Sequence, residues 1–284
     1  MHEAALGDRL ATRQLGRAGR LRVVPSVGST NDELRRAALA GRARAGEVLI
    51  ARAQTAGRGR GDHRWESPAG SGLYLSALLP VTLPPEDLGR ITLACGVALW
   101  DLVDSRGVSA RLRWPNDVLV GERKLAGILC ELVAGPDLQA AAPQLLVVAG
   151  IGLNVDLRGA TLPPPLRDEA TSLAEELGAQ AEAAPVPEPL ELVPELLVRL
   201  EDRVAQATTA PDALLEDWRA RWGDRGRRLQ VTAGGQRGLV GTGRGVARDG
   251  ALLLETDTGP IHVISGTVRP TDRPEPEGAD PCCW

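Results

Sequence analysis

The pattern of apolar residues in this 284-residue chain changes near residue 225, and this change constrains the fold more than any other feature. Before it, apolar residues recur at helical spacing in some segments and as continuous strand-like runs in others. After it, from Arg228 to Val268, short β-type runs are separated by glycine or by Asp249-Gly250, which is a hairpin signal. We therefore expect an α+β fold with a mixed or antiparallel sheet, followed by a small all-β module with barrel-like spacing.

The first part of the chain predicts both helices and strands. Ser29 or Thr30 is a suitable N-cap for a helix over 29–43, and apolar residues at helical spacing predict a second helix over 88–105. Thr171-Ser172 caps a short helix that ends near Gly178. The other expected helices cover 189–207 and 212–222, and the expected strands cover 47–53, 73–79, 110–114, 125–133, 145–155, 229–232, 239–246, 251–255 and 261–265.

Four regions follow from this reading: an N-terminal extension (1–20), the main domain (21–224), the β module (225–270) and a tail (271–284) rich in proline and acidic residues, which we expect to be disordered. No apolar run approaches the roughly 18 residues needed to span a bilayer, and the first 20 residues lack a hydrophobic signal core. These features predict a cytoplasmic protein that does not bind membranes. The formal net charge of −4 argues against a dedicated nucleic-acid binder.

The four cysteines indicate neither a disulfide framework nor a metal site. Cys95 and Cys130 lie in apolar runs and are interpreted as small buried hydrophobic residues. Cys282 and Cys283 are adjacent near the end of the sequence and have no His or Cys partners at zinc spacing. We expect no structural disulfide and no metal cage.

Lys124 is the only lysine, so 32 of the 33 basic residues are arginines, and the only asparagines are Asn31, Asn116 and Asn154. Arginine replaces a solvated surface lysine at little cost, but it does not replace a compact ammonium in a tight site. The few remaining Lys and Asn residues therefore indicate function. Each lies in a short, unusual motif, which makes chance survival of all four a weak explanation.

Residues 54–61 read Gln-Thr-Ala-Gly-Arg-Gly-Arg-Gly, the strongest local signal in the chain. Glycines let the backbone approach a ligand, and arginines supply forked donors for an anion. The segment lacks the Gly-Lys-Ser/Thr ending of a Walker loop, and no helix follows as in a dinucleotide fingerprint. Taken alone, it has two other interpretations, a solvated Arg/Gly loop and an RNA-contacting patch.

Two further motifs carry polar groups to the ends of strands. In the run 113–117, Arg-Trp-Pro-Asn-Asp, the proline disfavours an α conformation of the preceding tryptophan, and Asn116 and Asp117 suit a turn. The alternative to a simple turn is a carboxylate beside a cationic pocket, with Lys124 meeting a phosphate or carboxylate oxygen. The run 150–154, Gly-Ile-Gly-Leu-Asn, predicts close backbone approach and places an amide suited to an adenine edge.

Together these motifs resemble the biotin–protein ligase family in order and rough spacing from about residue 24 to residue 155. The motifs are Ser-Thr-Asn (29–31), Gln-Thr-Ala-Gly-Arg-Gly-Arg (54–60), Trp-Pro-Asn-Asp (114–117), Arg-Lys-Leu-Ala-Gly-Ile-Leu (123–129) and Gly-Ile-Gly-Leu-Asn (150–154). The resemblance implies a class II synthetase-like catalytic domain and an SH3-like barrel for the C-terminal module. It also implies that biotin and ATP form biotinyl-5′-adenylate and that biotin then passes to a lysine of biotin carboxyl carrier protein.

The resemblance also implies roles for individual residues. Catalysis would rest on Lys124, Asp117 and Arg60, with Asp117 receiving the acceptor lysine's proton and contacting the Mg²⁺ that accompanies ATP. The expected biotin-binding residues are Ser29, Thr30, Asn31, Gln54, Arg58, Gly59, Arg60, Lys124 and Gly127. The expected nucleotide-binding residues are Arg58, Arg60, Trp65, Asn116, Asp117, Lys124 and Asn154.

The sequence departs from the family pattern at three places. His63 occupies a position where arginine is common, so one contact to the intermediate depends on His63 or on the neighbouring Arg64. Arg113 stands where lysine is frequent. The 20 residues that precede the main domain are too few for the DNA-binding domain of the family's repressor members, so we expect a ligase without operator binding. Family members occur as monomers and as homodimers.

Three rival functions remain at this stage. A lipoate– or octanoate–protein ligase shares the fold and the lysine chemistry, although the Gly-Arg-Gly-Arg loop and Trp-Pro-Asn-Asp favour biotin. A non-catalytic biotin or nucleotide sensor needs neither Lys124 nor Asp117 to recognise a neutral ureido ring. An RNA-binding protein would show steeply salt-dependent affinity.

Overall fold

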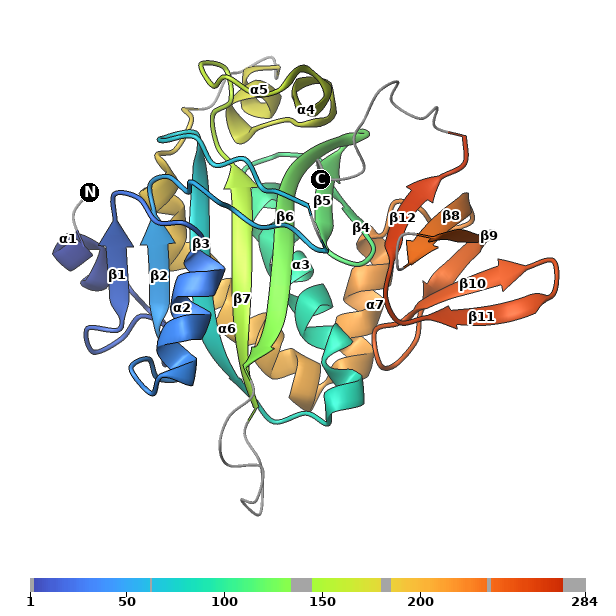
Figure 1. Cartoon of the computed structure of the whole chain (residues 1–284), viewed down its shortest axis with the longest axis horizontal. Coiled ribbons are helices and arrows are strands. Elements are labelled where there is room, and N and C mark those ends of the chain that lie inside the picture. Colours follow the sequence, from blue (N-terminus) through green and yellow to red (C-terminus); the bar gives the residue numbers. More distant parts are fainter. Residues whose placement is uncertain (1–2, 62, 134–144, 180–184, 234–235, 273–284) are drawn as a thin grey trace.

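The computed structural model describes residues 3–61, 63–133, 145–179, 185–233 and 236–272. Its centre is a mixed seven-stranded sheet in the order β1-β2-β3-β7-β6-β5-β4, in which β1 and β2 are parallel and the other neighbours antiparallel (Figure 1). The strands are β1 (Leu21–Val24), β2 (Val48–Ala51), β3 (Gly72–Val81), β4 (Arg111–Arg113), β5 (Asp117–Val120), β6 (Arg123–Val133) and β7 (Leu145–Asn154). The mixed α+β fold expected from the sequence is confirmed.

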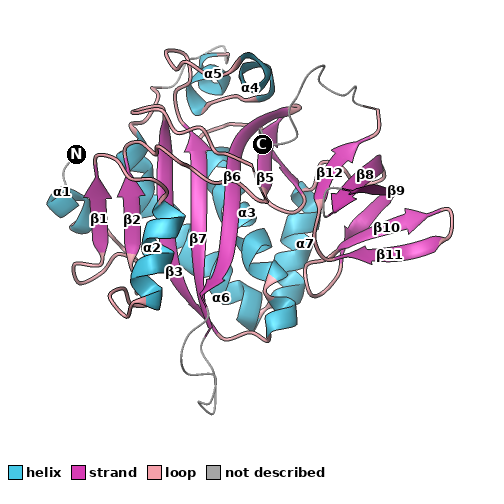
Figure 2. Cartoon of the chain, viewed as in Figure 1, coloured by secondary structure: helices cyan, strands magenta, loops and turns pink. Residues whose placement is uncertain are grey.

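Helices cover both faces of this sheet (Figure 2). On one face lies α2 (Thr30–Leu39), which packs on β3 and β7. On the other face lie α3 (Gly89–Asp104), α6 (Val193–Thr209) and α7 (Pro211–Arg221), which pack on one another. The remaining helices are α1 (Glu3–Gly7), α4 (Pro164–Glu169), α5 (Leu173–Gly178) and two 3₁₀ turns at Pro85–Asp87 and Pro189–Leu192.

The central layer is stabilised by aliphatic burial. Strand β3 has nine buried residues in a run of ten, as expected for a strand covered on both faces. The residues around α1 belong to the same core, because Leu6, Leu10 and Leu15 are buried within it. The N-terminal segment therefore packs on the main domain through β1.

A second sheet follows the helices and has the order β11-β10-β9-β8-β12. Its strands are β8 (Arg228–Ala233), β9 (Gln236–Val246), β10 (Leu252–Thr256), β11 (Gly259–Val263) and β12 (Thr267–Pro270). The four strands expected here are confirmed, and β12 is an additional one. The hairpin predicted at Asp249-Gly250 joins β9 to β10, with Gly250 at φ +90°.

The two sheets meet at close contacts near the start of α3. The indole nitrogen of Trp114 donates to the carbonyl of Gly250 at 2.9 Å. A Cβ on Gly89 would lie 2.7 Å from the carbonyl oxygen of Asp249, so this approach requires glycine. These contacts place the β9–β10 turn beside Trp114, at the end of β4, and the start of α3.

A buried ion-pair cluster joins the sheets on their other side. Asp224, fully buried between α7 and β8, accepts from Arg111 and Arg113 of β4. Glu122 pairs with both arginines and with Arg227. Burial alone would raise the pKa of Glu122, but hydrogen bonds from Arg113 and Arg227 lower it to about 2. Arg113 therefore has a structural position away from the cleft described below.

Several expected boundaries were wrong. The helix expected over 29–43 ends at Leu39, because Gly41 turns the chain at φ +68°. The helix expected over 189–207 begins as a 3₁₀ turn and then runs from Val193 to Thr209. Strands β1 and β5 were not expected, and Asp117 opens β5 instead of closing a turn.

Three other expectations concern the tail, the cysteines and membranes. Thr271 and Asp272 are held by Arg228 and Arg227, and the rest of the expected tail, 273–284, lies outside the described residues. Cys95 is a buried free thiol, as expected, whereas the free thiol of Cys130 is half-buried. Within the described part of the chain, no helix has the length and apolar character needed to cross a membrane.

Candidate active site

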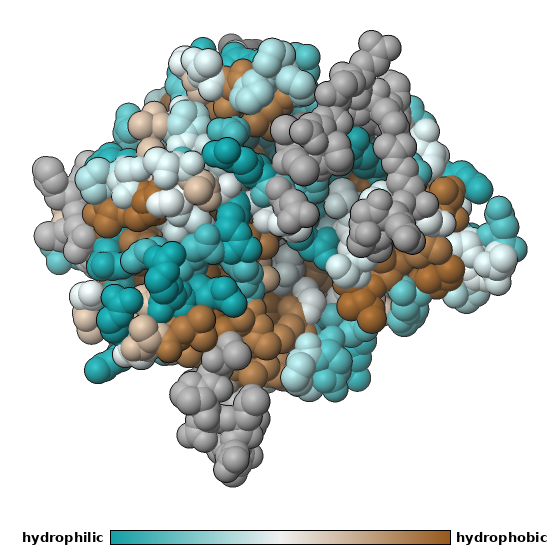
Figure 3. Space-filling model, viewed as in Figure 1, coloured by the Kyte–Doolittle hydropathy of each residue, from teal (hydrophilic) through white to brown (hydrophobic). Residues whose placement is uncertain are grey.

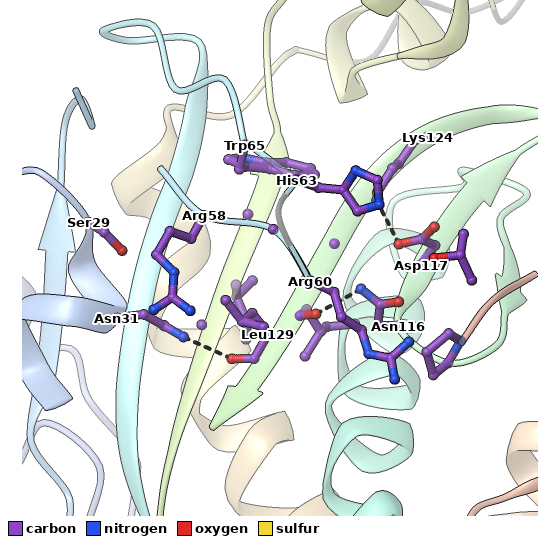
Figure 4. Close-up of a pocket in the computed structure, with 18 of the residues that line it drawn as sticks. Ser29, Asn31, Arg58, Arg60, His63, Trp65, Asn116, Asp117, Lys124 and Leu129 are labelled. Atoms are coloured by element: carbon purple, nitrogen blue, oxygen red, sulfur yellow. Dashed lines mark hydrogen bonds and ion pairs between the residues drawn. The ribbon is translucent and has the colours of Figure 1, made fainter. Parts of the chain in front are cut away.

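A cleft open to solvent lies over β6 and β7 between the start of α2 and β12. On this side of the molecule hydrophilic side chains gather over α2 and the adjoining loop (Figure 3). The residues expected from the motifs converge here from distant parts of the chain (Figure 4). Those that line the cleft are Ser29, Asn31, Gln54, Arg58, Gly59, Arg60, His63, Trp65, Asn116, Asp117, Lys124 and Gly127.

The floor of the cleft is made of glycines on facing strands. Gly127 of β6 pairs with Gly152 of β7, and Trp65 lies on both, since a Cβ on Gly152 would come within 2.3 Å of its ring. A Cβ on Gly150 would lie 2.1 Å from Oδ1 of Asn31. Close approach at these glycines was expected, and the groups that approach are the protein's own side chains. The indole nitrogen of Trp65 is buried without a hydrogen-bond partner among the described residues.

One end of the cleft holds a neutral hydrogen-bond network. Gln54 Oε1 accepts from the backbone nitrogen of Thr30 at 2.8 Å and from its hydroxyl at 3.1 Å. Ser76, fully buried on β3, lies 2.8 Å from Thr30 Oγ1 and 2.6 Å from Asn31 Oδ1. Gln54 Nε2 donates to Ser67. Thr30 thus turns toward Gln54 and Ser76 and supports the cleft without lining it.

The Gly/Arg loop folds back on itself as a narrow hairpin. Gly59 donates to the carbonyl of His63 at 2.7 Å, and Trp65 donates to the carbonyl of Gly57 at 3.0 Å. A side chain at Gly57 would collide with the Trp65 carbonyl at 2.3 Å, so the turn requires glycine there. This backbone geometry directs Arg58 and Arg60 to different parts of the cleft.

Arg58 is held by two carboxylates. It bonds Glu131 of β6 at 2.9 and 3.2 Å, and it pairs with Asp32 of α2. Burial lowers the pKa of Arg58, but the hydrogen bonds to Glu131 and Asp32 outweigh it and raise the pKa overall.

Arg60 is held by neutral acceptors of the second sheet. It donates to Ser265 Oγ at 2.8 Å and to the carbonyl of Gly266, and its guanidinium lies 6.0 Å from the Trp114 ring centroid. Burial lowers the pKa of Arg60, against the opposing effect of Asp117. This arginine connects the loop to the second sheet.

Lys124 and Asp117 form the third charged group of the cleft. Lys124 Nζ lies 2.7 Å from Asp117 Oδ1 and 5.5 Å from the Trp65 ring centroid. Asp117 is paired across the strands with Gly127, and Asn116 donates to the carbonyl of Ile128 at 2.9 Å. The Trp-Pro-Asn-Asp run thereby brings Asp117 to the lysine and Asn116 to the backbone of β6.

A second hollow lies on the far side of Trp65. It is lined by Arg64, Trp65, Glu66, Lys124, Asn154, Leu157, Leu162, Leu166 and Ala170. Asn154 donates to the carbonyls of Thr171 and Lys124, which leaves its side-chain oxygen as an acceptor. Arg64 donates to the carbonyl of Thr55 and lines this hollow, whereas His63 lines the main cleft. Arg64 therefore does not take the place that His63 occupies.

The described residues contain no group of three or more His, Cys, Asp or Glu side chains that could hold a metal ion. Mg²⁺ bound to a nucleotide, however, needs one or two protein carboxylates besides phosphate and water. Asp117 is such a carboxylate, so the cleft fits a metal that arrives with its substrate.

The contributors not identified from the sequence include Asp32, Ser76, Glu131 and the pair Ser265-Gly266. None lies in one of the motifs. The signal available was weak, since Glu131 is a charged residue in the apolar run that follows Lys124 in β6, and Ser76 is a hydroxyl in the apolar strand β3.

Comparison with known proteins agrees with this arrangement. The model of the biotin/lipoate A/B protein ligase family matches residues 23–150, which span the cleft from β1 to β7. Fold and site thus define a protein of the class that attaches biotin or lipoate to other proteins.

Individual relatives indicate which family within this class the chain belongs to. The chain is 36% identical over 272 residues to the biotin–[acetyl-CoA-carboxylase] ligase of Mycobacterium tuberculosis, covering 93% of this chain and 95% of the relative. It is 31% identical over 240 residues to the bifunctional ligase/repressor BirA of Escherichia coli, covering 84% and 70%. The structure of biotin protein ligase from Aquifex aeolicus in complex with biotin and ATP superposes with a TM-score of 0.71 at 25% identity, covering 88% and 99%. The chain belongs to the biotin–protein ligase family.

Proposed function

We propose that this protein is an ATP-dependent biotin–protein ligase that makes biotinyl-5′-adenylate and transfers biotin to a lysine of a carrier protein. One observation supports this above all: a neutral hydrogen-bonding end and three cations, Arg58, Arg60 and Lys124, share one cleft. A neutral ureido ring needs paired donors and acceptors, whereas a carboxylate and a phosphate need cations. The cleft offers both: the neutral network lies at one end with Arg58 close beside it, and Arg60 and Lys124 lie toward the other.

The first half-reaction joins two anions. A carboxylate oxygen of biotin attacks the α-phosphorus of ATP, a new O–P bond forms, and pyrophosphate leaves with the electrons of the broken P–O bond. Lys124 stabilises the charge shared by the carboxylate and the α-phosphate, and Arg58 and Arg60 hold the two anions in place. ATP enters with Mg²⁺, which offsets phosphate charge, and Asp117 is the carboxylate that would contact it.

The second half-reaction needs a base. The ε-amine of the acceptor lysine attacks the acyl carbon of the adenylate, AMP leaves, and the amine loses a proton. Asp117 would receive that proton. Asp117 is paired with Lys124 in this structure, and it would be freed to act as the base if Lys124 turned to the phosphate of the adenylate.

The nucleotide fits the second hollow. Leu157, Leu162, Leu166 and Ala170 form its aliphatic part, and Trp65 offers a ring face. Asn154 also lines it, and its side-chain oxygen can accept from an exocyclic amine. Trp65 lines both cavities, so it would separate the biotin from the adenine while contacting each.

We also propose how the chain divides into domains. We assign residues 21–224 to a class II synthetase-like catalytic domain and residues 225–270 to an SH3-like barrel. The five-stranded antiparallel order and the strong bulge in the β9–β10 pairing support the barrel. The acceptor is a biotin carboxyl carrier protein, in keeping with the relative from M. tuberculosis.

Biotin-dependent ATP–pyrophosphate exchange tests this function, with Lys124→Arg as the variant. We expect exchange that requires biotin and falls by about 10²-fold or more in the variant, because the larger guanidinium cannot replace a point charge in this geometry. Arg123→Lys is the matched control, since Arg123 is next to Lys124 in the sequence but its side chain is exposed and pairs with Glu176.

Other outcomes identify rival functions. Exchange with lipoate or octanoate in place of biotin would assign the protein to the sister ligases. Tight biotin binding without exchange would indicate a sensor.

A further inference from the structure

Glu131 binds two segments that are far apart in the sequence. Its Oε1 accepts from Arg58 Nη2 at 2.9 Å, and its Oε2 accepts from Arg58 Nη1 at 3.2 Å and from Asn31 Nδ2 at 3.0 Å. Arg58 belongs to the Gly/Arg loop and Asn31 to α2, so one carboxylate of β6 connects the roof of the cleft with its neutral end.

The position of Glu131 in its strand explains this reach. Side chains alternate between the two faces of a strand, so Gly127, Leu129 and Glu131 project to the same face of β6. Gly127 and Leu129 line the cleft, and the carbonyl of Leu129 also accepts from Asn31 Nδ2 at 3.0 Å. Glu131 therefore lies at the rim of the cleft, two residues along β6 from Leu129, which lines it.

The donors of Arg58 show how it remains available for a ligand. A guanidinium has five N–H donors in a fixed fork. Asp32 and the two oxygens of Glu131 engage three of them, which leaves two. A carboxylate in the cleft can be bound by the remaining donors while Glu131 and Asp32 keep the fork in place.

Carboxylates offset the positive charge of most cations in the cleft. Two of its three cations have carboxylate partners, Arg58 with Glu131 and Asp32, and Lys124 with Asp117. Arg58 is thus the cation with the largest number of charged partners, and its position is determined by them more than by loop packing, since its side chain is 36% exposed.

We infer that Glu131 is a positioning residue for recognition of the biotin carboxylate, acting through Arg58 and Asn31 with Asp32 as a second support. The inference rests on the proposed function. Glu131 fixes the separation between the guanidinium that meets the carboxylate and the end of the cleft that meets the ring.

The test is steady-state exchange at saturating ATP with varied biotin, using Glu131→Gln. Glutamine keeps the size of the side chain and an acceptor for Asn31 but lacks the charge that holds Arg58. We expect the KM for biotin to rise about tenfold, the scale of losing one charge-assisted hydrogen bond, while kcat stays within about twofold. Asp32→Asn is expected to raise the KM by a smaller factor, because the Asp32 carboxylate bonds Arg58 through one oxygen, whereas Glu131 bonds it through two.

A double-mutant cycle separates positioning from a general structural role. In an Arg58→Gln background, Glu131→Gln is expected to change the KM less than threefold, because its partner is already absent. Glu195→Gln serves as the control, since Glu195 pairs with Arg106 and Arg199 away from the cleft. Thermal melting of each variant reports folding independently of activity.

Two results would overturn the inference while leaving the function intact. One is an unchanged KM for biotin in both Glu131→Gln and Asp32→Asn when wild type is active. The other is an equal, additive effect of Glu131→Gln with and without Arg58. Absence of biotin-dependent exchange in wild type would instead contradict the proposed function.

Discussion

The two ends of the cleft are built by different physical means (Figure 4). At the end beneath α2, Thr30, Asn31, Gln54 and Ser76 form a buried neutral network whose members bond one another. At the other end, Lys124 rests on Asp117, and Arg60 rests on acceptors of the second sheet.

This difference separates recognition from chemistry. The neutral end can receive a ligand without changing its own bonds, because its polar groups are already oriented. At the charged end, Lys124 is already paired with Asp117, so an anion bound there would share the ammonium with that carboxylate. Substitutions at the two ends should consequently affect different kinetic constants.

The largest effect is expected from a substitution at the charged end of the cleft. Asp117→Asn should reduce biotin transfer to the carrier lysine by about 10²-fold, because the base is lost. Pyrophosphate exchange should fall by less than tenfold, since it measures the first half-reaction and the proton is removed in the second. The two half-reactions are measured separately, by streptavidin blotting of the carrier and by pyrophosphate exchange.

Asp257→Asn, at an exposed site in the β10–β11 turn, is the control for this experiment. Equal losses in both half-reactions of Asp117→Asn would show that Asp117 mainly positions Lys124 or the nucleotide.

An intermediate effect is expected from a substitution at the neutral end of the cleft. Gly150→Ala places a methyl group 2.1 Å from Asn31 Oδ1 and must displace this buried side chain. We expect biotin affinity to weaken by roughly 30-fold, corresponding to about 2 kcal/mol for overpacking, with little change in kcat. Calorimetric titration with biotin measures it. Gly159→Ala, where a Cβ meets nothing within 4 Å, should bind as wild type does.

The smallest expected effect concerns the link to the second sheet. Ser265→Ala removes one exposed hydrogen bond from Arg60, which keeps its bond to the carbonyl of Gly266. Exchange should change by about fivefold or less, because one exposed hydrogen bond contributes only about 1 kcal/mol. A loss above tenfold would show that the second sheet controls Arg60 far more strongly than its contacts indicate.

The motifs predicted much of the cleft because each carries an unusual composition at a strand end or in a glycine loop. Asn31, Arg58, Trp65, Asp117 and Lys124 were all expected, and all line it. Their proximity follows from the sheet order, in which β6 and β7 lie between β3 and β5.

The partners of these residues were beyond the reach of sequence patterns. Glu131 is one of 37 acidic residues, and its importance comes from strand register and from a loop folded over the sheet. Ser265 meets Arg60 across 205 positions of sequence. Strand β1 has four residues, too few for a periodic signal, and β5 begins within what reads as a turn.

The solitary lysine has a practical consequence for studying this protein. An acylating reagent such as an N-hydroxysuccinimide ester would find a single side-chain amine in the chain, and it lies within the cleft, 15% exposed and paired with Asp117. Modification of that amine would register as one mass increment on one peptide, apart from the α-amino group. The rate of that increment, followed as the cleft is filled with biotin, with nucleotide or with both, would report occupancy at the reacting position.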